Sequence, residues 1–240
     1  MLPDRVAGGE FLLATLRRGP YIATMKTVTL GSTTIPAGKL LCIGRNYPEH
    51  AREMKAEVPK DPVVFLKPSS AIIAPGETIV IPPFSHEVHH EVEMVVLIGK
   101  QGRNIARVSA FEYVGGYAVG LDMTLRDVQA EAKKKGLPWT IAKGFDTSAP
   151  VSPFVPAESV PDPSNLALSL LVNGEERQRG STADMLFPVD VLFSYLSTIF
   201  TLEPGDLIFT GTPEGVGPVV TGDMLEASLE PVASLLVGVR

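Results

Sequence analysis

One stretch, residues 89–100, constrains the fold more than any other part of the chain. It reads HHEVEMVVLIGK, and the side chains of a strand alternate between two faces. Glu91 and Glu93 are therefore expected on one face of an otherwise apolar strand. Burying two like charges side by side is costly unless a cation lies between them, and Mg²⁺ prefers carboxylate and water oxygens. The solvated face of an edge strand is the alternative.

The composition is that of an ordinary globular protein and excludes several classes of partner. The chain has 240 residues, 45% of them hydrophobic and 20% charged, with a net charge of -6. No basic run predicts binding to nucleic acid, and the apolar runs are too short to span a membrane. Cys42 is the only cysteine, which favours a reducing compartment. We expect the cytoplasm, or the mitochondrion if the source is eukaryotic.

Residues 48–57 predict a short charged helix with few apolar side chains. His50 and Glu53 lie at positions i and i+3 and share one face of it. A segment anchored by so few apolar contacts, at about 46–60, is predicted to be a lid that orders when a ligand binds beneath it. A plain surface helix is the alternative.

A second helix is predicted after the buried strand that ends at Asp122. Thr124 and Asp127 match the capping-box pattern, and Gly136 is a typical helix end. Arg126 and Gln129 lie at i and i+3 of this helix, close behind Asp122, so both side chains are expected to face the same cavity.

One metal-binding pattern is rejected on its context. Residues 86–90 match H-E-x-x-H, which holds zinc only when a helix points both histidines the same way. Two prolines precede the match and a strand pattern follows it. A different turn, residues 211–217, is rich in glycine, and its backbone amides are expected to suit an anion such as a carboxylate.

Short motifs in one order cover nearly all of residues 25–240, and together they resemble the fumarylacetoacetate hydrolase family. They are Gly44-Arg45-Asn46-Tyr47, Phe65-Leu66-Lys67-Pro68, His90-Glu91-Val92-Glu93, Gly115-Gly116-Tyr117, Asp122-Met123-Thr124, Pro138-Trp139-Thr140, Lys143 and Gly211-Thr212-Pro213. The resemblance implies a mixed α+β, mainly β fold built on a rolled sheet. It implies one catalytic domain over residues 25–240, and leaves residues 1–24 as an N-terminal extension or small cap. It also implies a homodimer with one Mg²⁺ or Mn²⁺ per subunit.

The same resemblance assigns roles to individual residues. The metal ligands it implies are Glu91, Glu93 and Asp122, which agrees with the strand pattern. The catalytic residues it implies are His50, Glu53 and Lys143. The substrate-binding residues it implies are Arg45, Lys67, Arg126, Gln129 and Thr212.

The activity implied is metal-dependent cleavage of the C3–C4 bond of a small 2-oxo acid. The branch of the family that the motifs match best hydrolyses acylpyruvates to pyruvate and a carboxylate, or decarboxylates oxaloacetate. An isomerase, decarboxylase or fumarylpyruvate hydrolase of aromatic catabolism is the alternative among enzymes. A metal-binding protein without turnover is the alternative from another class, although the intact His50, Glu53 and Lys143 argue against it.

Overall fold

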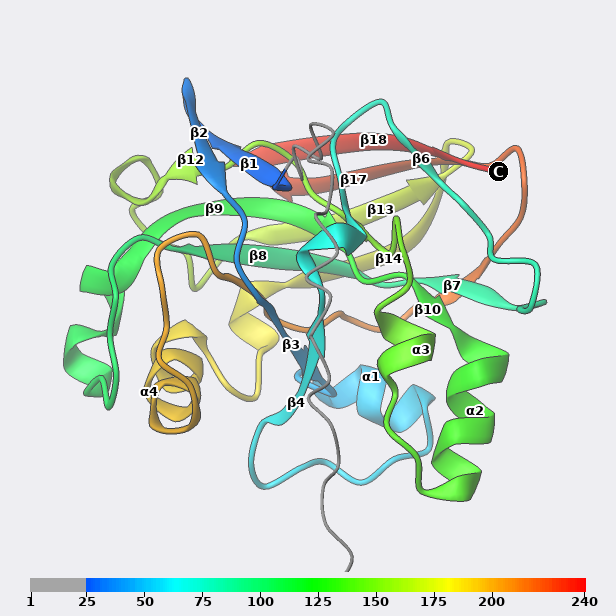
Figure 1. Ribbon diagram of the computed structural model, residues 1–240, viewed down its shortest axis with the longest axis horizontal. Helices are drawn as coiled ribbons and strands as arrows, with labels where there is room; N and C mark the ends of the chain where they lie inside the picture. The colour runs from blue at the N-terminus through cyan, green and yellow to red at the C-terminus, as the bar shows by residue number, and fades with distance from the viewer. Residues whose placement is uncertain (1–24) are drawn as a thin grey trace, which may run out of the picture.

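The computed structural model describes residues 25–240 (Figure 1), so the extension or cap predicted at residues 1–24 lies outside the described part. Two larger sheets, three small ones and four α-helices make up the described part. Within these residues no sheet closes into a barrel. The expectation of a mixed, mainly β fold with rolled sheets is confirmed.

The larger of the two main sheets has six strands and carries the longest buried strands. In spatial order it contains β12 (Val155–Pro156), β9 (Val114–Leu121), β8 (Val92–Ile98), β15 (Leu207–Phe209), β3 (Leu40–Gly44) and β4 (Val63–Lys67). Every residue of β8 is buried. Because both faces of β8 are covered, its sequence is a nearly continuous apolar run instead of an alternating one.

The second main sheet has five strands and packs against the first through β9, which contacts β17 and β18. In spatial order it contains β14 (Glu175–Ser181), β13 (Ala167–Val172), β17 (Met224–Glu230), β18 (Ala233–Val239) and β6 (Thr78–Ile79). Asn173 and Gly174 join β13 to β14 with positive φ angles of 53° and 80°. This is the backbone that a tight hairpin turn requires, and the pair predicts such a turn from sequence.

Three small sheets complete the β structure. They are β1 (Thr27–Leu30) with β2 (Thr33–Pro36), β11 (Ala149–Pro150) with β5 (Ile72–Ile73), and β10 (Thr124–Leu125) with β7 (Val88–His90) and β16 (Gly217–Val219). The last of these extends the line of β8 beyond Glu91.

The helices flank the six-stranded sheet. They are α1 (Pro48–Glu53), α2 (Arg126–Lys135), α3 (Thr140–Lys143) and α4 (Val189–Ile199), with short 3₁₀ turns at Ser69–Ala71, Arg107–Tyr113, Ala157–Ser159 and Thr182–Asp184. In Figure 1, α1, α2 and α3 lie together at the lower right, below the strands, and α4 lies at the lower left. None of the helices in residues 25–240 combines the length and the apolar character that a membrane crossing needs.

The capping box expected at Thr124 and Asp127 is wrong. Thr124 belongs to β10, and α2 begins two residues later, with no side chain capping its first turn. The Thr124 hydroxyl instead donates to Glu91 Oε1 at 2.9 Å, and Asp127 accepts from the hydroxyl of Ser85. The predicted end of the helix is confirmed, because Gly136 adopts a left-handed conformation with φ 63°.

The continuous strand expected over residues 89–100 is interrupted at Glu91. β7 ends at His90 and β8 begins at Val92. The backbone N–H of Val92 donates to the side-chain oxygen of Gln178 at 3.0 Å. The ladder of backbone hydrogen bonds between strands is therefore interrupted at Glu91.

The close approach of β8 and β9 depends on glycine. A Cβ atom on Gly99 would lie 2.7 Å from the Cα of Gly115. We expect Gly99→Ala to lower the free energy of unfolding by about 1–3 kcal/mol, because backbone atoms must shift to admit the methyl group. Urea denaturation followed by circular dichroism measures this. The exposed neighbour substitution Gln101→Ala should change stability by less than about 0.5 kcal/mol, and equal losses in both variants would contradict the steric explanation.

Candidate active site

Two antiparallel strands bring three carboxylates together. Glu93 lies on β8 opposite Gly120 of β9, and Asp122 follows the end of β9. The backbone N–H of Asp122 donates to the carbonyl oxygen of Glu91 at 2.9 Å, which holds the two residues side by side. One carboxylate oxygen from each of Glu91, Glu93 and Asp122 lies within 4.8 Å of the others. All three residues are buried, and β8 is a central strand, so the solvated edge-strand alternative is excluded.

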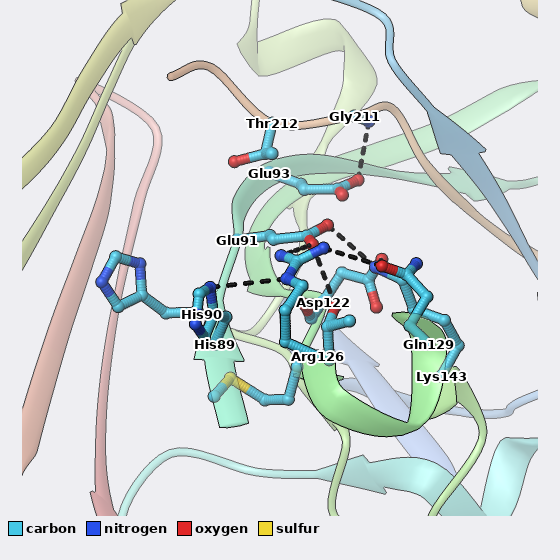
Figure 2. A network of polar contacts seen from close by, with 12 residues as sticks. His89, His90, Glu91, Glu93, Asp122, Arg126, Gln129, Lys143, Gly211 and Thr212 are labelled. Atoms are coloured by element: carbon cyan, nitrogen blue, oxygen red, sulfur yellow. Dashed lines mark hydrogen bonds and ion pairs between the residues drawn. The ribbon is translucent and has the colours of Figure 1, made fainter. Parts of the chain in front are cut away.

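Three cations from different elements surround this carboxylate cluster. Lys143, at the end of α3, places Nζ 2.9 Å from Glu91 Oε2 and 2.5 Å from Asp122 Oδ2. Arg126, at the start of α2, donates to Glu91 Oε1 at 2.7 Å (Figure 2). Lys67, at the end of β4, places Nζ 2.8 Å from Asp122 Oδ1. The negative charges of Glu91 and Asp122 are therefore compensated by ion pairs.

Glu93 stands apart from these ion pairs. Its Oε2 accepts from the backbone N–H of Gly211 at 2.7 Å, and within residues 25–240 no cation forms an ion pair with it. Burial, followed by repulsion from Asp122 and Glu91, raises the pKa of Glu93 well above its ordinary value. Burial acts in the same direction on Glu91, but Lys143 and Arg126 outweigh it and hold the pKa of Glu91 far below its ordinary value.

These residues fit a divalent cation. The Oδ1 atom of Asp122 has no hydrogen-bond partner, because Lys67 approaches it without hydrogen-bond geometry. Glu93 offers a carboxylate that lacks a cation. Three carboxylates with oxygens facing one another are the donor set that Mg²⁺ or Mn²⁺ prefers, and they leave positions for other oxygen ligands. Glu91, Glu93 and Asp122 are the residues that would hold the ion.

A pocket of about 350 Å³ opens above the carboxylate cluster. The structure brings seven of the residues singled out by the sequence to its wall: Arg45, His50, Glu91, Arg126, Gln129, Lys143 and Thr212. The side chains of Arg126 and Gln129 hydrogen-bond to each other at 2.9 Å, as their spacing on one helix face predicts (Figure 2). The remaining residues, Glu53, Lys67, Glu93 and Asp122, do not line it.

His50 and Glu53 form a hydrogen-bonded pair on α1. His50 Nδ1 lies 3.1 Å from Glu53 Oε2, and the other oxygen of Glu53 accepts from the backbone N–H of Gly215 at 3.1 Å. Glu53 thus joins α1 to the glycine-rich turn and fixes the orientation of the imidazole. The predicted helix is present at Pro48–Glu53, while its movement as a lid stays a prediction.

Lys67 is buried and does not line this pocket. Its ammonium group donates to the carbonyl oxygens of Met123, Lys143 and Ser148 and to the Ser148 hydroxyl, besides pairing with Asp122. Substrate binding by Lys67 stays a prediction. What its contacts provide is an anchor that holds Asp122 and the end of α3 together.

Gln178 is a buried residue of the site that the sequence did not point to. Its oxygen contacts His90 Nδ1 at 2.9 Å, and its nitrogen donates to the Thr212 hydroxyl at 2.8 Å. With its bond to Val92, Gln178 connects the broken strand to the glycine-rich turn. It lies in the polar strand EERQRGS, where nothing distinguishes it from its exposed neighbours. Lys133 and Trp139 also line the pocket without having been assigned a role.

A larger cavity, of about 1260 Å³, adjoins this pocket and shares Phe65 and Trp139 with it. It runs along the edge strand β4 and between α3 and α4, and its walls are mainly apolar. None of the three clustered carboxylates lines it. We therefore place the chemistry in the smaller pocket, where the titratable groups converge.

Comparison with known proteins agrees with the geometry. Residues 39–240 match the family model described as fumarylacetoacetate (FAA) hydrolase C-terminal. The chain belongs to the fumarylacetoacetate hydrolase family. It is 53% identical over 196 residues to "Oxaloacetate tautomerase FAHD1, mitochondrial" of Homo sapiens, covering 82% of this chain and 89% of that protein. It is 53% identical over 191 residues to the Arabidopsis thaliana protein of the same name, covering 80% of this chain and 86% of that protein.

A solved structure of the same family adds a ligand to the comparison. It is a fumarylpyruvate hydrolase from Pseudomonas aeruginosa in complex with Mn²⁺ and pyruvate. The two chains are 42% identical and superpose with a TM-score of 0.85 over 89% of this chain and 94% of the other. This chain is therefore an enzyme of the family, and the Mn²⁺ of its relative agrees with the carboxylate cluster found here.

Replacing Glu93 by Gln tests the metal site. We expect one Mn²⁺ to bind per wild-type chain. Glu93→Gln should weaken this binding by more than about 100-fold, because even residues that only hydrogen-bond to metal ligands change metal affinity by about 10–100-fold when they are replaced. Isothermal titration calorimetry measures the affinity.

The exposed substitution Glu226→Gln is the matched control and should leave Mn²⁺ affinity unchanged. Without metal, Glu93→Gln should unfold at a temperature no lower than wild type, because the amide removes the repulsion that raises the pKa of Glu93. Unchanged Mn²⁺ binding in Glu93→Gln would contradict the assignment.

Proposed function

We propose that the protein is a divalent-metal-dependent enzyme that interconverts the keto and enol forms of oxaloacetate. The observation that carries the proposal is the position of His50, which lines the same pocket as Glu91 and Lys143 and is oriented by Glu53. A base, a cation and a carboxylate cluster thus converge on one small cavity. The names of the relatives agree with this reaction.

The reaction moves one proton. In keto-oxaloacetate, C3 lies between two carbonyl carbons, so its protons are acidic. His50 takes a proton from C3 and releases it to solvent, and the oxygen on C2 takes a proton from solvent, so that the base is restored. When bound, the divalent cation acts as a Lewis acid that stabilises negative charge on the oxygens of the 2-oxo acid. Lys143 adds positive charge at the same place, and Glu53 holds the imidazole in position for the transfer.

Arg126 and Gln129 are positioned to hold the substrate. Arg126 is fixed by Glu91 on one side and by Gln129 on the other, and both side chains line the pocket. A guanidinium held in this way suits a carboxylate oxygen of the substrate. Thr212, held by Gln178, offers a hydroxyl on the opposite wall.

Cleavage of the C3–C4 bond is a second candidate, favoured by the Mn²⁺–pyruvate complex of the related fumarylpyruvate hydrolase. In hydrolysis, His50 would take a proton from a water that attacks the distal carbonyl of an acylpyruvate, releasing pyruvate and a carboxylate. In decarboxylation of oxaloacetate no water attacks, so a base is not needed for bond breaking. The homodimer and the cytoplasmic location expected from the sequence remain proposals for this chain.

The first test follows each reaction with Mg²⁺, with Mn²⁺ and with a chelator. Ultraviolet absorbance of the enol reports tautomerisation of oxaloacetate, and a coupled assay reports pyruvate from acetylpyruvate or oxaloacetate. Metal-dependent acceleration of the enol–keto exchange supports the proposal. Exchange at the uncatalysed rate, with pyruvate released from acetylpyruvate, would assign the protein to the hydrolases instead.

Substituting the base separates the reactions. We expect His50→Gln to lower kcat for tautomerisation and for acylpyruvate hydrolysis by about 10²–10⁴-fold, because both need a proton moved by the imidazole. Decarboxylation should fall much less. Glu49→Gln, on the exposed side of the same helix, is the matched control and should leave all three rates unchanged. Equal losses in hydrolysis and decarboxylation would rule out this division of roles.

A further inference from the structure

The side chain of Gln178 uses its whole hydrogen-bonding capacity inside the protein. Gln178 lies on β14 and is 1% exposed. Its oxygen accepts from the backbone N–H of Val92 at 3.0 Å and lies 2.9 Å from Nδ1 of His90. Its nitrogen donates to the carbonyl oxygen of Pro213 at 3.0 Å and to the hydroxyl oxygen of Thr212 at 2.8 Å. A primary amide has two hydrogens to donate and two lone pairs on its oxygen, so all four are occupied.

The backbone partners of Gln178 fix the orientation of its amide. The N–H of Val92 can only donate, and the carbonyl oxygen of Pro213 can only accept. The amide oxygen must therefore face Val92, and the amide nitrogen must face Pro213. The second hydrogen of the nitrogen then points at Thr212, whose hydroxyl oxygen accepts it. By the same reasoning, Nδ1 of His90 carries the hydrogen that it donates to Gln178.

The Thr212 hydroxyl keeps one hydrogen to donate, and the amide fixes where it can point. Thr212 is 2% exposed and lines the pocket, and among the described residues its hydroxyl donates to no protein group. The hydrogen cannot turn toward Gln178, because the amide nitrogen presents its own hydrogen there. A buried donor is stabilised when it finds an acceptor, and the oxygens of a ligand in the pocket are acceptors.

Strand β14 packs so closely against the glycine-rich turn 211–217 that the two cannot shift relative to each other. A Cβ atom on Gly180 of β14 would lie 2.6 Å from Cβ of Pro213. A Cβ atom on Gly215 of the turn would lie 2.2 Å from the carbonyl oxygen of Arg177, the residue before Gln178. The amide is therefore held in one position beside the turn.

The same turn contacts two other parts of the site. The backbone N–H of Gly211 donates to Glu93, and Figure 2 shows Thr212 beside Gly211. The backbone N–H of Gly215 donates to Glu53, which orients His50. The position of the Thr212 hydroxyl is thus set relative to both the carboxylate cluster and the base.

We propose that Gln178 is a positioning residue that fixes the Thr212 hydroxyl as a hydrogen-bond donor toward an oxygen of the substrate. The inference rests on the proposed 2-oxo acid site. The carboxylate and 2-oxo oxygens of such a substrate only accept hydrogen bonds, and so does the enolate oxygen that forms during proton transfer. A hydroxyl already oriented as a donor matches them without reorganising when the substrate binds.

A double-mutant cycle on ligand binding tests this role. Isothermal titration calorimetry measures the affinity of the Mn²⁺-saturated protein for pyruvate, the simplest 2-oxo acid. We expect Thr212→Val to weaken pyruvate binding by about 10–100-fold, the size expected of a hydrogen bond to a charged group. Gln178→Glu should also weaken it, because a carboxylate accepts from the Thr212 hydroxyl and turns its hydrogen away from the ligand. This loss should be at least about fivefold smaller when Thr212 is already Val, because the hydroxyl through which Gln178 acts is then missing.

Two further variants and a control complete the cycle. Thr212→Ser, which keeps the hydroxyl, should restore most of the affinity that Thr212→Val loses. Gln178→Met decides by the same cycle if the buried acid of Gln178→Glu prevents folding. Gln101→Glu is the matched control, because Gln101 is exposed and does not line the pocket, and it should leave pyruvate affinity unchanged in both backgrounds.

The outcomes separate this inference from the proposed function. Equal losses from the Gln178 substitution in the two backgrounds would show that Gln178 acts through the general structure of the site, and would overturn the inference while the 2-oxo acid site stands. Pyruvate binding with the expected coupling, but without accelerated enol–keto exchange of oxaloacetate, would overturn the proposed reaction and support the inference. A wild-type protein that does not bind pyruvate would overturn both.

Discussion

The burial of three carboxylates within 4.8 Å of one another sets what the surrounding structure must supply. Like charges in a dry interior destabilise the folded state unless cations and hydrogen-bond donors compensate them. The compensation comes from three elements that are distant in sequence: Lys67 at the end of β4, Arg126 at the start of α2 and Lys143 at the end of α3. These elements must therefore pack beside the β8–β9 pair, and the pocket lies where they meet.

The alternating pattern of residues 89–100 predicted part of the fold around the site. Alternation correctly placed Glu91 and Glu93 together on an otherwise apolar strand, but it left open whether their face is buried or solvated. Neither alternation nor composition could show that the strand breaks at Glu91, because the break depends on a hydrogen bond from Val92 to Gln178, a residue far along the chain. The hairpin at Asn173 was foreseeable, since its turn chemistry is local.

The incorrect prediction of a capping box at Thr124 also results from a contact with a residue distant in sequence. A helix cap competes with every other acceptor within reach of the hydroxyl, and the Thr124 hydroxyl is taken by Glu91. The spacing of Arg126 and Gln129 on one helix face was readable from sequence, as was the pairing of His50 with Glu53. Their roles came from resemblance to a family. Gln178 contacts His90 across 88 residues of sequence, and no local pattern records such a contact.

The wall that holds Trp139 separates the pocket from the larger apolar cavity, and this residue lines both. Trp139 is the only tryptophan of the chain, and it lies 6.0 Å from the ring of Phe65 and beneath the ammonium group of Lys133. Indole emission responds to nearby charge and to water. The tryptophan fluorescence of this protein, excited selectively near the red edge of the absorption band, thus originates from one side chain that lies at the wall of both cavities.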